Sequence, residues 1–287
     1  MSGLLVGIDG GGTLCRAALQ WNGGRAEVAV PGANAFSDPD GCIQAINAAL
    51  GALAEKAAVD VAGLAGAPAY LALAGVTGPE IAERIAARLP LRRAVIEEDR
   101  RAALAGALNG ADGAVAVCGT GSFVAFQQGG TVRFAGGYGL MLGDEASGAW
   151  LGRAAVSAVL AARDGIGPAT ALTEALQDSV GDSAALLDLG RSATPRDFGA
   201  LAPRVTQAAG TGDKVALRLM QQGAGYIADC VMALGWRPGL RLCLAGGVGP
   251  RFALYLPELL REAVSPPDGT ALDGALSLAR QMAEAAE

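Results

Sequence analysis

The stretch Leu4–Thr13, which reads LLVGIDGGGT, is the feature that most constrains how this chain can fold. Its apolar half, Leu4 to Ile8, is typical of a short buried strand bounded by glycine. Asp9 then lies where the strand leaves the core, and three glycines and Thr13 follow. Glycine backbone turns tightly and lets an anion approach its N–H groups. The stretch therefore indicates either a glycine-rich hairpin turn or a turn that holds a phosphate and its Mg²⁺.

The order of strand, glycine-rich turn, strand, glycine turn and strand occurs twice along the chain. The first copy runs from Leu4 to Val30 and has a hairpin turn at Asn22-Gly23-Gly24. The second runs from Ala114 to Ala135 and has the turn Gly119-Thr120-Gly121-Ser122 after its first strand. Such a repeat predicts two like domains, each with a phosphate-type turn, and a nucleotide held in a cleft between them. Two unrelated β-meanders are the alternative.

Capping residues and hydrophobic patterns predict the remaining elements. Further strands are expected at Ala69–Ala74, Ala94–Glu98 and Arg241–Ala245. Helices are expected from Pro39 to about Ala58, from Thr77 to about Leu89, after Asp99, from Glu145 to about Arg163, over most of 168–235, from Pro250 to about Ala263, and over 271–285.

Composition excludes several classes of function. The net charge of −6 argues against non-specific binding of nucleic acid, which needs a basic face. The chain has no histidine, so a catalytic proton acceptor is expected to be a carboxylate. Its five cysteines form no C-x-x-C pair, which argues against zinc and thioredoxin-like chemistry.

The same composition indicates where the protein works. Scattered free thiols are typical of a reducing compartment, so a cytoplasmic location is expected. The early acid and the lack of a basic start predict that the N-terminus is not a signal peptide. The most apolar window, 57–76, is interrupted by Asp60, Pro68 and glycines, so no membrane span and no membrane partner are expected.

Four features could carry chemistry, and each also has a purely structural explanation. Asp99 follows a strand and precedes a helix, where it could cap the helix or act as a general base. Asp144 has the same two interpretations. Asn34 lies in a Pro/Gly loop, where asparagine is common in turns. Gly246–Gly249 follow an apolar strand and could lie against an adenosine or simply turn into a helix.

Taken together, these motifs resemble the acetate kinase/hexokinase/actin-like ATPase superfamily and, within it, the BadF/BadG/BcrA/BcrD ATPase family. The similarity covers nearly the whole chain and is greatest to the N-acetylglucosamine kinase and glucosamine kinase members. The most specific motif is GGYGLMLGDEASG at 136–148. The others are GIDGGGT (7–13), LALAGV (71–76), EEDRRAALAGA (97–107), CGTGS (118–122) and LAGGVG (244–249).

The resemblance implies an α/β fold of two RNase H-like domains with a nucleotide and sugar cleft between them. The first domain would cover 1–108 and be completed by the C-terminal helix at 270–287, and the second would cover 109–269. The activity implied is ATP-dependent phosphorylation of N-acetylglucosamine or glucosamine at the 6-hydroxyl. ATP and Mg²⁺ would be required, and a homodimer is left open.

The resemblance also implies roles for individual residues. Asp99 would be the base that activates the sugar hydroxyl, and Asp9 would help to place Mg²⁺. The nucleotide would be bound by Gly11, Gly12, Thr13, Gly119, Thr120, Gly121, Gly246 and Gly247. The sugar would be held by Asn34, Gly137, Tyr138, Gly139 and Asp144.

Departures from the family pattern qualify these roles. Arg100 stands where relatives usually have a small residue, which leaves open whether it pairs with Asp99 and lowers the pKa of that carboxyl group. Tyr138 replaces a tryptophan found in some relatives and leaves the contact with the sugar ring open. The zinc-binding Cys/His cluster of the ROK kinases is missing from the sequence.

Two other functions compete with the kinase. Relatives that activate CoA-ester reductases or dehydratases hold an iron–sulfur cluster with cysteines, but here only Cys118 lies near a phosphate-type turn. A catalytically silent sugar sensor is the third hypothesis, and the lack of a DNA-binding segment before Leu4 argues against a regulator of that kind. Which sugar is the acceptor depends on a pocket for its 2-substituent, which the sequence leaves undefined.

Overall fold

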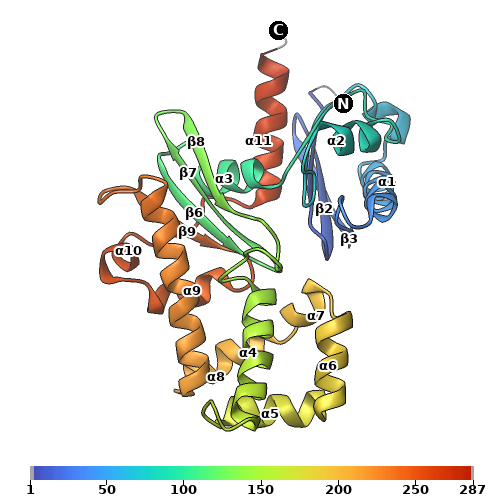
Figure 1. The fold of residues 1–287 in the computed structure, drawn as a ribbon. Coiled ribbons are helices and arrows are strands. Elements are labelled where there is room, and N and C mark those ends of the chain that lie inside the picture. Colours follow the sequence, from blue (N-terminus) through green and yellow to red (C-terminus); the bar gives the residue numbers. More distant parts are fainter. Residues whose placement is uncertain (1–2, 286–287) are drawn as a thin grey trace. The chain divides into compact units, whose positions relative to one another are not determined.

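Two compact units make up the computed structural model, which describes residues 3–285 (Figure 1). Unit 1 contains the residues up to Ala111 together with those from Pro267 onward, and unit 2 runs from Asp112 to Pro266. Each unit has its own sheet, and each sheet starts with an antiparallel meander of three strands. This repeat confirms the α/β fold class with two related sheets.

The sheet of unit 1 has five strands in the order β3-β2-β1-β4-β5. Strands β4 and β5 run parallel to β1, so the carboxyl ends of these three strands share one edge of the sheet. The bounds are β1 Leu5–Gly10, β2 Leu14–Trp21, β3 Gly24–Pro31, β4 Pro68–Leu73 and β5 Arg93–Glu97. Strand β1 passes the expected end at Ile8 because Asp9 and Gly10 continue to pair with β2.

Helices cover both faces of this sheet. They are α1 Pro39–Lys56, the 3-10 turn η1 Val61–Leu64, α2 Pro79–Ala86, α3 Arg100–Leu108 and α11 Ala271–Glu284. Alternate residues of β1 point to opposite faces, and Val6 and Ile8 pack in the core that contains the buried residues of α1. Leu5 packs with α11 on the other face. Gly7 makes room for that helix, since a Cβ there would lie 2.9 Å from the side chain of Leu276.

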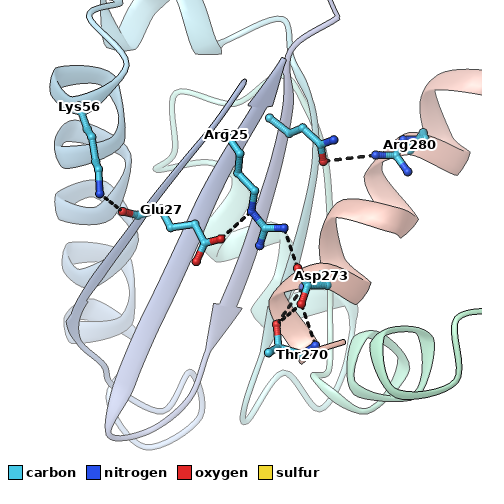
Figure 2. Close-up of polar contacts among 7 residues, drawn as sticks. Arg25, Glu27, Lys56, Thr270, Asp273 and Arg280 are labelled. Atoms are coloured by element: carbon cyan, nitrogen blue, oxygen red, sulfur yellow. Dashed lines mark hydrogen bonds and ion pairs between the residues drawn. The ribbon is translucent and has the colours of Figure 1, made fainter. Parts of the chain in front are cut away.

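Polar contacts fasten α11 to the sheet of unit 1 (Figure 2). Thr270 and Asp273 form a capping box at the start of the helix, in which each side chain binds the backbone N–H of the other residue. The Asp273 carboxylate also accepts a hydrogen bond of 2.7 Å from Arg25 on β3. Farther along α11, Arg280 donates to Gln20 on β2 at 3.2 Å. The C-terminal segment is thus an integral layer of unit 1.

The sheet of unit 2 has four strands in the order β8-β7-β6-β9, with β9 parallel to β6. Their bounds are β6 Gly113–Cys118, β7 Ser122–Gln128, β8 Thr131–Gly136 and β9 Arg241–Ala245. The helices are α4 Gly148–Arg163, α5 Ala171–Val180, α6 Ser183–Ser192, α7 Pro195–Gly199, α8 Ala202–Gly210, α9 Lys214–Ala233, the 3-10 helix η2 Gly249–Tyr255 and α10 Glu258–Glu262. Asp182, Thr194 and Asp213 cap α6, α7 and α9, and each of their side chains accepts a hydrogen bond from a backbone N–H of its helix.

Two predicted helices of unit 2 are wrong in their extent. Helix α4 begins at Gly148 rather than Glu145, and its N-cap is Ser147, whose hydroxyl accepts from the N–H of Trp150. The helix expected from Pro250 to Ala263 is split into η2 and α10. Leu256 has extended backbone between them, because Pro257 disfavours the helical conformation in the residue before it.

Within residues 3–285, none of the helices has both the length and the apolar character needed to cross a membrane. The apolar window 57–76 contains η1 and β4 instead.

Candidate functional site

Acidic residues gather at the carboxyl edge of the unit 1 sheet, at the ends of β1 and β5. In the strand register, Asp9 on β1 pairs with Ala72 on β4, and Ala72 pairs with Glu97 on β5. Residues in register on adjacent strands point to the same face of a sheet. Asp9 and Glu97 therefore share one face, separated by the small side chain of Ala72. Asp99 follows directly after β5, and we call Asp9, Glu97, Glu98 and Asp99 the carboxylate edge.

Within the carboxylate edge, Asp9 pairs with an arginine on the strand that follows the glycine turn. Arg16 lies directly opposite on β2, and its guanidinium is 3.3 Å from the Asp9 carboxylate. The side chain of Asp9 is only 16% exposed. Burial raises the pKa of Asp9, and the charge and hydrogen bond of Arg16 offset that effect only in part.

Asp99 is the N-cap residue of α3 by position, but a capping hydrogen bond does not account for its carboxylate. Its backbone is already helical, and its side chain makes no capping hydrogen bond to α3. Burial, the charge of Asp9 and the charge of Glu98 together raise the pKa of Asp99 to about 6. A carboxyl group with this pKa is half-ionised close to neutral pH and suits a general base.

Arg100 is next to Asp99 in the chain, but it does not set the net direction in which the pKa of Asp99 shifts. The Arg100 guanidinium donates to Glu98, so its charge is shared with that carboxylate. Arg100 does act to lower the pKa of Asp99, but burial and the two neighbouring carboxylates outweigh it. Asp99 consequently keeps a raised pKa next to an arginine.

Glu97 is the last residue of β5, close to Asp99, and two side chains contact its carboxylate. The buried hydroxyl of Tyr70 on β4 donates to Glu97 at 2.5 Å, and Arg101 on α3 lies 4.0 Å from the same carboxylate. A cavity of about 350 Å³ opens beside this end of β5. It is lined by Val76, Thr77, Gly78, Pro79, Ala82, Ile96, Glu97 and Glu98.

The turn between β1 and β2 leaves fewer backbone N–H groups free for a phosphate than its three glycines suggest. The N–H of Gly11 donates to the carbonyl of Leu14 at 3.0 Å, so this group closes the turn itself. Gly12 and Thr13 are exposed, and their backbone is open to an approaching anion.

Asn34 lies against this turn and has a fixed side-chain orientation. Its Oδ1 accepts from the backbone N–H groups of Phe36 and Ser37 at 3.0 and 3.1 Å. Because those partners are donors, the atom they contact must be the oxygen, and the side-chain NH₂ points the other way. A Cβ on Gly12 would lie 3.7 Å from Asn34, and one on Gly75 would lie 2.4 Å from its oxygen. Asn34 therefore packs between the loop of Gly12 and the loop of Gly75 in unit 1.

In unit 2, the turn after β6 is held by the first residues of α4. The carbonyl of Gly119 accepts from the N–H of Gly148 at 2.8 Å, and that of Thr120 accepts from Ala149 at 3.3 Å. Within the turn, the N–H of Gly119 donates to Gly121 at 2.9 Å. Thr120 and Gly121 remain exposed.

Asp144 supports this turn and does not cap α4, which corrects the expectation from the sequence. Its side chain is buried, and its carboxylate accepts from the backbone N–H groups of Gly139 and Ser122. It also touches Gly121, where a Cβ would lie 2.9 Å from the carboxylate oxygen. Burial raises the pKa of Asp144 despite these hydrogen bonds. Its φ of +62° lies in the left-handed region, which aspartate adopts more readily than most residues with a side chain.

The loop before Asp144 carries the other predicted sugar ligands. Gly137 and Gly139 have φ values of +80° and +81°, so glycine is required at both positions. The N–H of Gly137 donates to the carbonyl of Ser122, which ties the loop to β7. Between the glycines, Tyr138 is 72% exposed and its ring has little packing of its own.

Gly246 and Gly247 differ in what requires a glycine. Gly246 has a φ of +83°, and a Cβ there would lie 2.4 Å from the carbonyl oxygen of Cys118, so packing alone explains it. A Cβ on Gly247 would meet nothing within 4 Å, and its backbone is exposed. Gly247 is thus the residue of this turn whose backbone a ligand could approach.

Sequence reasoning missed Arg16, Tyr70 and Glu97 as members of the unit 1 site. The signal for Arg16 was present, because a short turn between two antiparallel strands places residues near its two ends opposite each other. Tyr70 and Glu97 required the register of β4 and β5, which the sequence does not contain.

Comparison with known proteins identifies similar chains. The model of the BadF/BadG/BcrA/BcrD ATPase family matches residues 6–267. Glucosamine kinase GspK from Vibrio cholerae is 30% identical over 278 residues, which cover 96% of this chain and 95% of that protein.

Solved structures show the same likeness. The crystal structure of a candidate N-acetylglucosamine kinase from Chromobacterium violaceum matches with a TM-score of 0.88 and 33% identity, covering 96% of this chain and 98% of that one. A second, from Porphyromonas gingivalis, matches with a TM-score of 0.72 and 21% identity over 96% and 97% of the two chains, a likeness that shows the fold.

Proposed function

The chain belongs to the BadF/BadG/BcrA/BcrD ATPase family, and from that membership we propose that it is an ATP-dependent kinase that phosphorylates an amino sugar. Relatives named glucosamine kinase and N-acetylglucosamine kinase support this class of acceptor. The observation that carries the proposal is Asp99, an acid whose side chain makes no capping hydrogen bond and whose pKa is raised to about 6 within the carboxylate edge.

In the proposed reaction, Asp99 is the general base. Its carboxylate accepts the proton of the sugar 6-hydroxyl as that oxygen attacks the γ-phosphorus of ATP, and ADP leaves. Phosphoryl transfer needs positioning and charge neutralisation more than covalent help, so a site without histidine suffices.

Asp9 is the proposed metal-side carboxylate. Among the described residues, no group of three His, Cys, Asp or Glu side chains is arranged to hold a metal ion by itself. Mg²⁺ does not need such a group, because it usually binds one or two carboxylates together with substrate phosphates and water. One partly buried carboxylate beside a glycine turn fits that pattern. Bound there, Mg²⁺ would neutralise charge on the phosphates.

The nucleotide contacts are proposed at the exposed backbone of the glycine turns. Gly12 and Thr13 in unit 1 and Thr120 and Gly121 in unit 2 would contact phosphates, and Gly247 would contact the adenosine. Gly11, Gly119 and Gly246 would contribute by shaping these turns, since Gly11 and Gly119 use their N–H groups within the turn and Gly246 packs on Cys118.

The sugar contacts are proposed at Asn34 and at the loop 137–144. The side-chain NH₂ of Asn34 would donate to a sugar oxygen, because its Oδ1 is already occupied. Tyr138, exposed between Gly137 and Gly139, would stack on the sugar ring. Asp144 would accept from a sugar hydroxyl with the capacity left by its two backbone partners.

The burial of Cys118 argues against the alternative of an iron–sulfur ATPase activator. A cluster shared between two subunits needs exposed thiolates. Cys118 is only 1% exposed, and burial raises the pKa of its thiol.

The test of the proposed function is an ADP-release assay with purified protein and MgATP. Glucosamine, N-acetylglucosamine and glucose would be offered in parallel, and the phosphorylated carbon would be assigned by ³¹P–¹H correlation NMR. We expect turnover with an amino sugar and a 6-phosphate product. Failure of every amino sugar to stimulate ADP release would refute the proposal.

A further inference from the structure

The turn at residues 139–143 closes on itself inside the loop of unit 2 that carries the predicted sugar ligands. The N–H groups of Leu142 and Gly143 both donate to the carbonyl of Gly139, at 3.1 and 2.9 Å. Two large apolar side chains on this turn, those of Met141 and Leu142, are 86% and 85% exposed. The turn is therefore a compact unit with little packing at its tip, and its position in unit 2 depends on a few contacts.

Leu140 fixes this turn to unit 2 through both its side chain and its backbone. The side chain is buried and packs in the hydrophobic core of unit 2. The carbonyl oxygen accepts a hydrogen bond of 3.0 Å from the guanidinium of Arg153, which lies on α4. Arg153 is thus the side chain that fixes the direction of the backbone in the middle of the turn.

The contact between Arg153 and Leu140 is a charge-assisted hydrogen bond without a competing acid. Within residues 3–285, the carbonyl of Leu140 is the one hydrogen-bond or ion-pair partner of the Arg153 guanidinium. A hydrogen bond from a charged donor is stronger than one between neutral groups, and partial burial strengthens it further. The guanidinium therefore contributes more to the order of the turn than a neutral donor would.

The proposed nucleotide turn of unit 2, at 119–121, is held by a different part of the same helix. The backbone N–H groups of the first two residues of α4, Gly148 and Ala149, donate to carbonyls of that turn. Such main-chain contacts survive a substitution at Arg153, whereas the guanidinium contact does not. Helix α4 thus supports two loops by separate means, and a change at Arg153 acts on the 139–143 turn alone.

We propose that Arg153 is a positioning residue of the sugar site, which holds the 139–143 turn in the conformation that binds the sugar. Tyr138 precedes this turn and Asp144 follows it, so the conformation of the turn sets where the two lie relative to each other. The N–H of Gly139 also donates to Asp144 at 3.2 Å, so a displaced turn affects that carboxylate directly. Without Arg153, the turn has to be ordered when the sugar binds, which weakens binding. The identity of the ligand rests on the proposed kinase function.

The test is calorimetric titration of Arg153→Gln with MgADP and with glucosamine or N-acetylglucosamine, whichever the wild-type protein phosphorylates. We expect the Kd for the sugar to rise roughly 5- to 50-fold and the Kd for MgADP to stay within about twofold of wild type. Arg153→Lys keeps a charged donor and should recover part of the loss. The matched control is Arg163→Gln, at the exposed end of the same helix, and it should match wild type.

Hydrogen exchange of the free protein, followed by mass spectrometry, tests the same contact without any ligand. The amides of Leu142 and Gly143 should exchange faster in Arg153→Gln, because the turn that protects them is no longer fixed to α4. The amides of Gly148 and Ala149 should keep their wild-type rates. Arg153→Lys, with intermediate effects, allows both measurements if Arg153→Gln does not fold.

Two results would overturn the assignment. Wild-type affinity for the sugar in Arg153→Gln would show that the turn needs no such support for binding. Equal weakening of sugar and MgADP would indicate a damaged helix α4 instead of a displaced sugar loop. A wild-type protein that binds none of the amino sugars would refute the kinase proposal, and the exchange rates would still decide whether Arg153 orders the turn.

Discussion

Burial raises the pKa of Asp99 most, and the carboxylate of Asp9, whose strand β1 lies two places from β5, is the next largest of the contributions that raise it to about 6. The two acids come together because β1, β4 and β5 are parallel and end at one edge. Ala72, on the strand between them, carries no charge that could offset either carboxylate. The parallel arrangement of these strands thus helps to raise the pKa of the proposed base.

Replacing Asp99 by asparagine should abolish phosphoryl transfer and spare binding of the sugar. A general base contributes about 10²- to 10⁴-fold to a rate, and asparagine keeps the size of the side chain without accepting a proton. Turnover is measured by ADP release and sugar affinity by calorimetry. Asp40→Asn, a change to an exposed acid on α1 in the same unit, is the control. Wild-type turnover in Asp99→Asn would remove Asp99 from the proposed role.

The pH dependence of kcat/KM should show the ionisation of Asp99. The base works only as a carboxylate, so kcat/KM should fall about tenfold per pH unit below about pH 6. Asp9→Asn removes one charge that raises this pKa, and any residual activity should show its inflection at lower pH. A profile that stays flat down to pH 5 would contradict the assignment.

Asp99 should also cost stability at neutral pH, and the sign can be worked out. Its folded pKa of about 6 lies above the ordinary value of 3.8, so ionisation above pH 6 is less favourable in the folded protein than in the unfolded one. The penalty is present above pH 6 and disappears as the pH falls toward 3.8. Asp99→Asn should therefore raise the free energy of unfolding by about 1–3 kcal/mol at pH 8 and leave it nearly unchanged at pH 4, as measured by urea unfolding. A destabilised variant at pH 8 would show that Asp99 stabilises the fold.

Asp144→Ala should weaken sugar binding much more than ADP binding. The change removes a proposed sugar ligand, and it also leaves the N–H groups of Gly139 and Ser122 without their acceptor, which costs about 1–3 kcal/mol of stability. Calorimetry with both ligands and thermal unfolding would measure the two effects. Asp164→Ala at the exposed end of α4 is the control. Equal losses for sugar and ADP would mean that Asp144 only supports the Gly119–Gly121 turn.

The strand and turn order was predictable because glycine marks each corner of the two meanders. Asp9 could be placed at a strand end, since a short apolar run and three glycines leave few alternatives. The ends of parallel strands could not be brought together without the register, so the contact of Tyr70 with Glu97 was not foreseen.

The loop before α4 shows a second limit to what the sequence can predict. Asp144 and Ala146 both have positive φ, which is rare for residues with a side chain and gives no signal in composition. An acid followed by a helix-like pattern therefore predicts a cap at Asp144, whereas the chain makes one more turn and is capped by Ser147. The folded loop overrides the local preference there.

The packing of α11 on α3 gives a prediction about stability that is independent of activity. Gly274 of α11 approaches α3 so closely that a Cβ would lie 1.9 Å from the carbonyl oxygen of Ala102. Gly274→Ala must push the two helices apart, and overpacking of this kind typically costs about 1–3 kcal/mol. In α1, by contrast, a Cβ on Gly51 would meet nothing within 4 Å. Gly51→Ala should stabilise the protein by about 0.5–1 kcal/mol, because alanine is the better helix former. Urea unfolding of the two variants compares the same Gly→Ala change at two sites of unit 1. An increase in the free energy of unfolding of Gly274→Ala would contradict the close packing of α3 and α11.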